Sequence, residues 1–240
     1  MSILKNIQVI EFAQGIAGPL AAVRLCDLGA KVIKWEQGTG DWMRSVPPFI
    51  KNSNIGATFF ELNRGKQSLS LGAKPNANKD FMSDQLKKAD IFITDRHIDE
   101  LKAIGLEDLD ADVYPGNPKL IRVFISPWGS KGPWSRRPGS ELTVQAMAGY
   151  TRYLGSRNEP ACRLGADVAS TGTGIFAVQA ILAALLSIRR GLSQGQSIHL
   201  SLLNSLISLK SIHLAAQSDP DRSAGPRVGG ANYPPERGWK

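Results

Sequence analysis

Strand-like and helix-like segments alternate along the early part of the chain, and this alternation constrains the fold more than any other feature. Residues 7–12 form a β-branched apolar run, residues 18–28 have helical character, and residues 31–35 form a second strand-like run. Gly29 stands where a glycine commonly ends a helix. Two strands joined through a helix in this way are normally parallel, with a right-handed crossover.

The same alternation continues toward the C-terminus and predicts an α/β fold: a Rossmann-like parallel sheet with helices on both faces. We expect residues 1–216 to form one large Rossmann-like domain. Residues 217–240 consist of turn formers and charges, and we expect them to connect to a small domain that is missing or incomplete. The further strands are expected at residues 90–94, 119–126 and 196–200, and the further helices at residues 78–88, 141–150, 171–190 and 202–216.

The chain shows no sign of a secreted, membrane or metal-binding protein. Its first residues turn polar too soon for a signal peptide. The longest apolar stretch, residues 174–188, contains Gln179 and falls short of the roughly 20 residues that span a bilayer. Cys26 and Cys162 have no metal-ligand spacing. We therefore expect a cytoplasmic protein with reduced thiols, no metal and no membrane partner.

The net charge of +8 is compatible with a polyanionic partner. Nucleic acid is disfavoured, because the lysines and arginines are scattered in short clusters and no basic run is interleaved with aromatic residues. A small anion fits this charge equally well.

Three glycines, Gly15, Gly18 and Gly29, follow the first expected strand. Their spacing is not G-x-G-x-x-G, so the dinucleotide-binding fingerprint is absent. A Gly–Pro pair that opens a helix can still present backbone N–H groups to a phosphate. A simple tight turn with Pro19 at the first helical position explains the same residues, and both interpretations stay open.

Four longer segments occur in one order: AGPLAAVRLCDLGAKVIKWEQGTGDWMR, ELNRGKQSLSL, WGSKGP and GIFAVQAILAALLSIRRGLSQGQSIHLSLLNS. Together they resemble the family III CoA-transferases (CaiB/BaiF-like), which include formyl-CoA transferase and carnitine CoA-transferase. The resemblance covers nearly the whole chain, yet only the N-terminal portion of a family member. It implies a large domain that binds CoA or an acyl-CoA as substrate, with no covalently bound cofactor. It also implies a homodimer, or a heteromer with another CoA-transferase-like chain.

The resemblance also implies which residues contact CoA. They are Gly15, Ile16, Ala17, Arg44, Leu71 and Lys74, and the basic pair Arg64 and Lys66 is a further candidate. Two arginines expected from the family pattern are replaced here, by Gln37 and by Ala103.

The chemistry implied by the resemblance begins with a carboxylate nucleophile. It attacks the acyl-CoA thioester to give a mixed anhydride, and the released CoA thiolate then forms an enzyme–CoA thioester. An ungapped match of the RLGADVAS stretch and the apolar helix after it places Ser170 at the position of the family's catalytic aspartate.

Neither Ser170 nor the nearby Asp167 is a simple replacement for that aspartate. Ser170 has no neighbouring histidine in the sequence, and its acyl product would be a stable ester. A helix cap made by Ser170 or Thr171 is the simpler interpretation. Asp167 lies about 5 Å from position 170 even on a single helical turn. It serves as nucleophile only if the loop is rebuilt, and otherwise it is an exposed or capping carboxylate.

A racemase, the other branch of the resemblance, needs a histidine in a G-H-D-like stretch, where this chain has Ser140 and Glu141. Three hypotheses for the function therefore stay open. The chain is an active CoA-transferase with Asp167 or another residue as nucleophile, a non-catalytic subunit beside an active partner, or a truncated inactive remnant.

Overall fold

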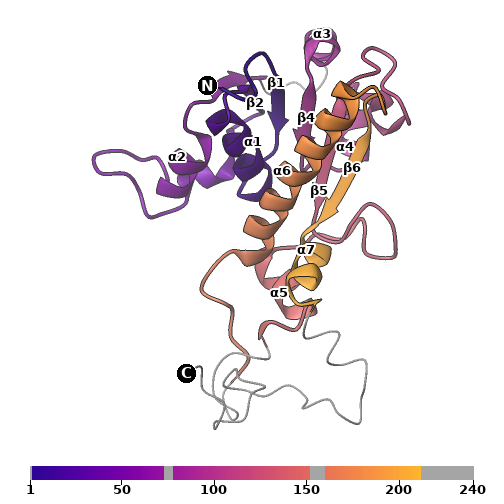
Figure 1. Cartoon of the computed structure of the whole chain (residues 1–240). Coiled ribbons are helices and arrows are strands. Elements are labelled where there is room, and N and C mark those ends of the chain that lie inside the picture. The colour runs from indigo at the N-terminus through magenta and orange to yellow at the C-terminus, as the bar shows by residue number, and fades with distance from the viewer. Residues whose placement is uncertain (1, 73–77, 152–159, 212–240) are drawn as a thin grey trace, which may run out of the picture. The chain divides into compact units, whose positions relative to one another are not determined.

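A six-stranded sheet with the strand order β3-β2-β1-β4-β5-β6 forms the centre of the fold (Figure 1). The computed structural model describes residues 2–72, 78–151 and 160–211. The pairs β3–β2, β2–β1, β1–β4 and β4–β5 are parallel, which confirms the predicted Rossmann-like sheet. The strands are β1 (Gln8–Phe12), β2 (Lys31–Glu36), β3 (Gln67–Ser70), β4 (Ile91–Thr94), β5 (Ile121–Ser126) and β6 (Ser197–Ser201).

The helices follow the predicted alternation with shifts at their ends. The long apolar helix α6 begins at Val168, three residues before the predicted start, so Ser170 lies inside it. Pro19 is the third residue of α1 rather than the first. The short helices α2 and α4 were not predicted. The helices are α1 (Ala17–Asp27), η1 (Trp42–Ser45), α2 (Ala57–Asn63), α3 (Lys79–Lys88), α4 (Ile98–Ala103), η2 (Glu107–Asp110), α5 (Glu141–Met147), α6 (Val168–Arg189) and α7 (Leu202–Leu209).

The chain divides into two compact units. The first unit contains residues 1–126 and 173–200, and the second contains residues 127–172 and 201–240. A single large domain over residues 1–216 was expected from the sequence. Its boundary with a connecting segment at residues 217–240 stays a prediction, because residues 212–240 lie outside the described part of the chain.

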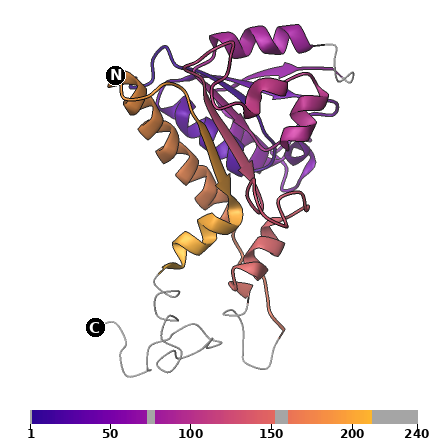
Figure 2. The ribbon, with the colours of Figure 1, turned by 90° about the vertical axis from the view of Figure 1, so that its right-hand side faces the viewer.

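In the first unit both faces of the sheet are covered, as is usual for parallel strands. Figure 2 shows helices beside the sheet in this unit. On one face Ile10, Trp35 and Phe92 pack with Met82 of α3 and Leu101 of α4 in a single apolar cluster. Because side chains alternate along a strand, the residues between them point to the other face. There lie the charged side chains of Glu11 and Lys34, both buried.

Helix α6 packs closely against α1 within the first unit. A Cβ atom at Gly174 would lie 2.8 Å from the carbonyl oxygen of Ala17 and 2.9 Å from Cδ2 of Leu20. Only a glycine allows this approach without a shift of α1. By length and composition alone α6 could cross a membrane, and the core helices of soluble proteins meet the same criterion.

Candidate functional site

The turn after β1 holds three of the predicted CoA contacts, Gly15, Ile16 and Ala17. Gly15 has φ +73°, a left-handed conformation that favours glycine. Its N–H group donates to Oδ1 of Asp41 at 3.1 Å. Helix α1 begins at Ala17, and no side chain caps its amino end. A side-chain carboxylate of the protein itself therefore occupies part of the turn where a phosphate was expected.

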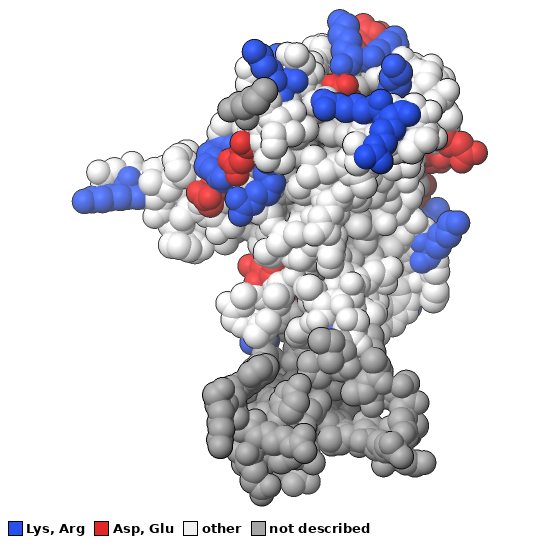
Figure 3. All heavy atoms as spheres, in the orientation of Figure 1, with Lys and Arg blue, Asp and Glu red and all other residues white. Residues whose placement is uncertain are grey.

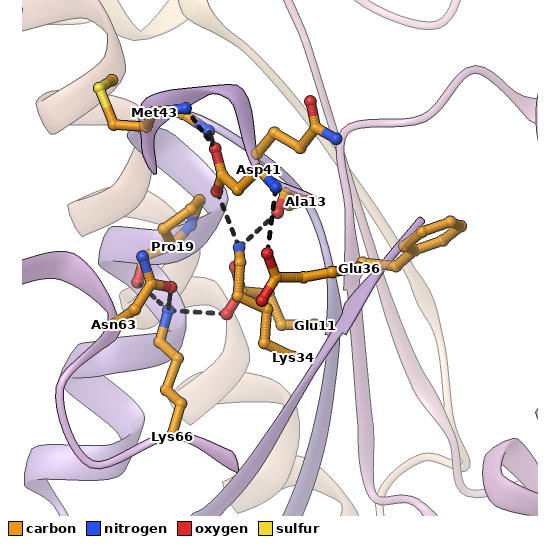
Figure 4. A network of polar contacts seen from close by, with 12 residues as sticks. Glu11, Ala13, Pro19, Lys34, Glu36, Asp41, Met43, Asn63 and Lys66 are labelled. Carbon is orange, nitrogen blue, oxygen red and sulfur yellow. Dashed lines mark hydrogen bonds and ion pairs between the residues drawn. The ribbon is translucent and has the colours of Figure 1, made fainter. Parts of the chain in front are cut away.

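Asp41 also belongs to a buried network of charges, shown in Figure 4. Its Oδ2 atom lies 3.0 Å from Nζ of Lys34, and its Oδ1 also accepts from the N–H of Met43 at 3.0 Å. Lys34 in turn donates to Oε1 of Glu11 at 2.7 Å. Burial would lower the pKa of Lys34, but the Glu11 and Asp41 carboxylates outweigh it and raise the pKa. This lysine is therefore a permanent cation of the first unit's interior.

Lys66 lies inside the same network and is not a surface cation. Its side chain is 2% exposed. The ammonium group donates to Glu11 at 2.7 Å, to the carbonyl oxygen of Pro19 at 3.0 Å and to Asn63 at 2.9 Å. Burial lowers the pKa of Lys66, and Glu11 opposes that shift. Because its ammonium group already has three hydrogen-bond partners within the protein, Lys66 links α1 to the sheet and is poorly placed to contact a phosphate.

Arg44 is paired with Glu36 at the carboxyl end of β2. Its Nε and Nη2 atoms donate to the two carboxylate oxygens of Glu36 at 2.8 and 2.6 Å, and its guanidinium lies 4.0 Å from the centre of the Phe59 ring. Burial would raise the pKa of Glu36, but hydrogen bonds from Arg44, Ser68 and the backbone of Asp41 lower it to about 2. Arg44 keeps a half-exposed face, so its contact with CoA stays a prediction.

The other predicted CoA contacts follow β3. Leu71 is buried, and its N–H group donates to the carbonyl oxygen of Glu36 at 2.8 Å. Lys74 lies outside the described residues. Arg64 is held at the surface by Asp27 and Glu61.

The amino end of α6, in the second unit, holds both candidate catalytic residues. Asp167 directly precedes the helix and is ion-paired with Arg163. Ser170 is almost buried, and its hydroxyl donates to Oε2 of Glu141 at 2.7 Å. The backbone N–H groups of Ser170 and Ala169 donate to the two carboxylate oxygens of Glu141 at 2.9 and 2.8 Å.

The prediction that Ser170 or Thr171 caps this helix is therefore wrong. Glu141, the first residue of α5, satisfies the first N–H groups of α6, and its side chain is further held by Nε2 of Gln145 at 2.9 Å. A carboxylate at a helix amino end is favoured by the helix dipole as well as by these hydrogen bonds. Sequence reasoning treated Glu141 only as part of a failed racemase motif, since a contact across 29 residues leaves no local signal.

The histidines occupy structural positions where they are described. His97 caps α4, its Nδ1 accepting from the N–H of Asp99 at 3.3 Å, and the ring of His199 stacks on Phe124. His213 lies outside the described residues. Ser140, at the racemase histidine position, forms a capping box with Thr143 at the start of α5. In the described ranges no group of three or more His, Cys, Asp or Glu is placed to hold a metal, and Cys26 and Cys162 are free.

Comparison with known proteins identifies relatives of this chain. It is 35% identical over 207 residues to succinate–glutarate CoA-transferase of Agrobacterium fabrum, and these residues are 84% of this chain and 51% of that enzyme. It is 28% identical to formyl-CoA:oxalate CoA-transferase of Streptomyces avermitilis, over 98% of this chain and 59% of that enzyme. A solved CaiB/BaiF family protein from Brucella suis matches with a TM-score of 0.79 and 30% identity, over 94% of this chain and 60% of its own.

The chain thus spans between about half and three fifths of the length of these relatives. The model of CoA-transferase family III matches residues 4–235, which is nearly the whole chain. This match, the parallel sheet and the relatives agree with the resemblance seen in the sequence. The chain belongs to CoA-transferase family III.

Proposed function

We propose that this chain binds CoA or an acyl-CoA at the carboxyl edge of its parallel sheet and acts in CoA transfer between an acyl-CoA and a carboxylic acid. Family membership carries the proposal. The strand order supports the location, because it reverses between β1 and β4, and doubly wound sheets bind ligands outside the strand carboxyl ends at such a reversal. The proposed contacts are those of the turn after β1 and the segments after β2 and β3: Gly15, Ile16, Ala17, Arg44, Leu71 and Lys74.

Calorimetric titration with free CoA tests the binding. We expect a dissociation constant of about 1 mM or tighter, weakening as salt is added because the ligand is an anion. Lys74→Gln should weaken binding. Lys119→Gln is the matched control, since it removes the same charge just before β5, at the opposite edge of the sheet. Absence of heat at high protein concentration, or an equal effect of the two variants, would contradict the proposed site.

A second candidate function is a non-catalytic CoA-binding subunit that works beside an active chain. It is favoured by Ser170, whose side chain carries no carboxylate, and by Asp167, whose carboxylate is paired with Arg163. Such a subunit binds CoA and forms no covalent adduct with it.

A further inference from the structure

A carboxylate lies beside Ser170 although none is present on residue 170 itself. The Oε2 atom of Glu141 is 2.7 Å from Oγ of Ser170. An aspartate at this position would put its carboxyl carbon close to where Oγ lies, with its oxygens about 1.2 Å further out. The nearer oxygen of Glu141 therefore lies about 1.5 Å or more from an oxygen of that carboxylate, directly beside the place where the resemblance leads us to expect one.

The surroundings of Glu141 suit a carboxylate that is acylated and then released. Glu141 is partly exposed. Two of its partners are backbone N–H groups in the first turn of α6, from Ala169 and Ser170. After acylation the same N–H groups face the carbonyl oxygen of the anhydride, where negative charge develops as a thiolate attacks. The Ser170 hydroxyl can rotate away from Oε2, which leaves a lone pair of that oxygen for attack while the N–H group of Ser170 keeps its hydrogen bond.

We infer that Glu141 is the nucleophile of this chain and that Ser170 positions it, an inference that rests on the proposed CoA binding. A carboxylate oxygen of Glu141 attacks the thioester carbonyl carbon, the C–S bond breaks, and CoA leaves as a thiolate. The thiolate then attacks the Glu141 carbonyl carbon of the mixed anhydride, and the original acyl group leaves as its carboxylate. The products are a glutamyl–CoA thioester and a free carboxylic acid, with no change in oxidation state.

Asp167 is the competing nucleophile, and its contacts argue against it. Its carboxylate is paired with Arg163, whereas Glu141 contacts Ser170 through both backbone and side chain. The carboxylate of Glu141 is in direct contact with residue 170, and we therefore favour it over that of Asp167 as the nucleophile.

The experiment uses the whole chain incubated with succinyl-CoA and, separately, with acetyl-CoA. Intact-mass spectrometry should show a gain equal to CoA less water. Hydroxylamine then converts the thioester to a hydroxamate, and peptide mapping of the wild-type protein should place it on Glu141. Glu141→Gln should abolish the gain and Ser170→Ala should slow it, because the hydroxyl that holds Oε2 is lost. Asp167→Asn should retain the gain at the wild-type rate. Because the mapping uses wild-type protein, it remains decisive even where a variant fails to fold.

The outcomes separate this inference from the proposed function. A hydroxamate on Asp167, or an adduct that survives in Glu141→Gln, overturns the role of Glu141. A wild-type protein that binds CoA in calorimetry but gains no mass also overturns it, and leaves the non-catalytic subunit standing. A protein that does not bind CoA overturns both the inference and the proposed function.

Discussion

At the scale of single residues, Asp41 connects three parts of the first unit. It accepts from Gly15 in the turn after β1 and from Met43 in η1, and it is paired with Lys34 of β2. Its side chain is fully buried. A buried carboxylate is tolerated only where hydrogen bonds and an opposite charge replace water, and Asp41 has both.

Two substitutions of Asp41 separate its charge from its hydrogen bonds. Asp41→Ala removes both and leaves Lys34 with one carboxylate partner, so we expect a loss of about 3–5 kcal/mol in the free energy of unfolding. Asp41→Asn keeps an oxygen for the N–H groups of Gly15 and Met43, so its loss should be smaller. Urea unfolding at pH 7 measures both. Equal losses would mean that the two hydrogen bonds contribute nothing measurable.

Because of Glu36, the protein should lose stability as the pH falls into the acid range. Its pKa is lowered to about 2 in the folded protein, against about 4.3 for an unperturbed glutamate. A carboxyl group with a lowered pKa stabilises the folded state above its unfolded pKa, and this contribution disappears as the pH falls toward the folded value. The contribution is about 3 kcal/mol for a shift of this size.

The measurement compares urea unfolding of the wild type with Glu36→Gln from pH 6 to pH 3. The wild type should lose stability more steeply below about pH 5 than the variant, which has no group to protonate at this position. Parallel pH profiles would show that the Glu36–Arg44 pair does not act in this way.

Among the elements, the close contact between helices α6 and α1 depends on Gly174, which has no side chain. A Cβ atom at Gly174 would lie 2.8 Å from the backbone oxygen of Ala17, so the two helices would have to separate. We expect Gly174→Val to lower the free energy of unfolding by about 1–3 kcal/mol, the usual cost of overpacking.

Gly165→Ala is the matched control for that prediction. A Cβ at Gly165 would meet nothing within 4 Å, and this glycine has no positive φ. The control should change stability by no more than about 0.5 kcal/mol. A Gly174→Val protein as stable as the control would show that α6 can move away from α1 at little cost.

For the whole molecule, the described residues leave part of the apolar surface of α6 uncovered. Ile175 and Leu186 of this helix are about half exposed among them. Figure 3 shows that Lys and Arg form separate groups on this side of the molecule, and that the surface between them is largely uncharged. Uncovered apolar surface of this kind favours association.

We therefore expect the chain to associate with a second copy in solution, as proposed from its family. Light scattering should give a mass of twice the 26.0 kDa of the chain. Leu186→Lys should shift this mass toward the monomer. Ile3→Lys, a substitution of an even more exposed apolar residue, should not. A wild-type protein at the monomer mass at high micromolar concentration would contradict the prediction.

The type and order of most elements could be predicted from local patterns of residues. Buried parallel strands appear as short apolar runs and a buried helix as a long one, so the segments around β1, α1, β2 and α6 could be recognised locally. The boundaries were less certain: the start of α6 was placed three residues late, because the carboxylate that caps it comes from Glu141, far back in the chain.

The roles of the charged residues, in contrast, follow from contacts between distant parts of the chain. Lys66 lies two residues after Arg64 in the sequence and is with it a candidate CoA contact by resemblance, yet the sheet brings it to Glu11, 55 residues away. In the same way Asp41 reaches Gly15 across 26 residues and Glu141 reaches Ser170 across 29. Side-chain contacts over such separations depend on strand order and helix packing, which no local pattern of residues records.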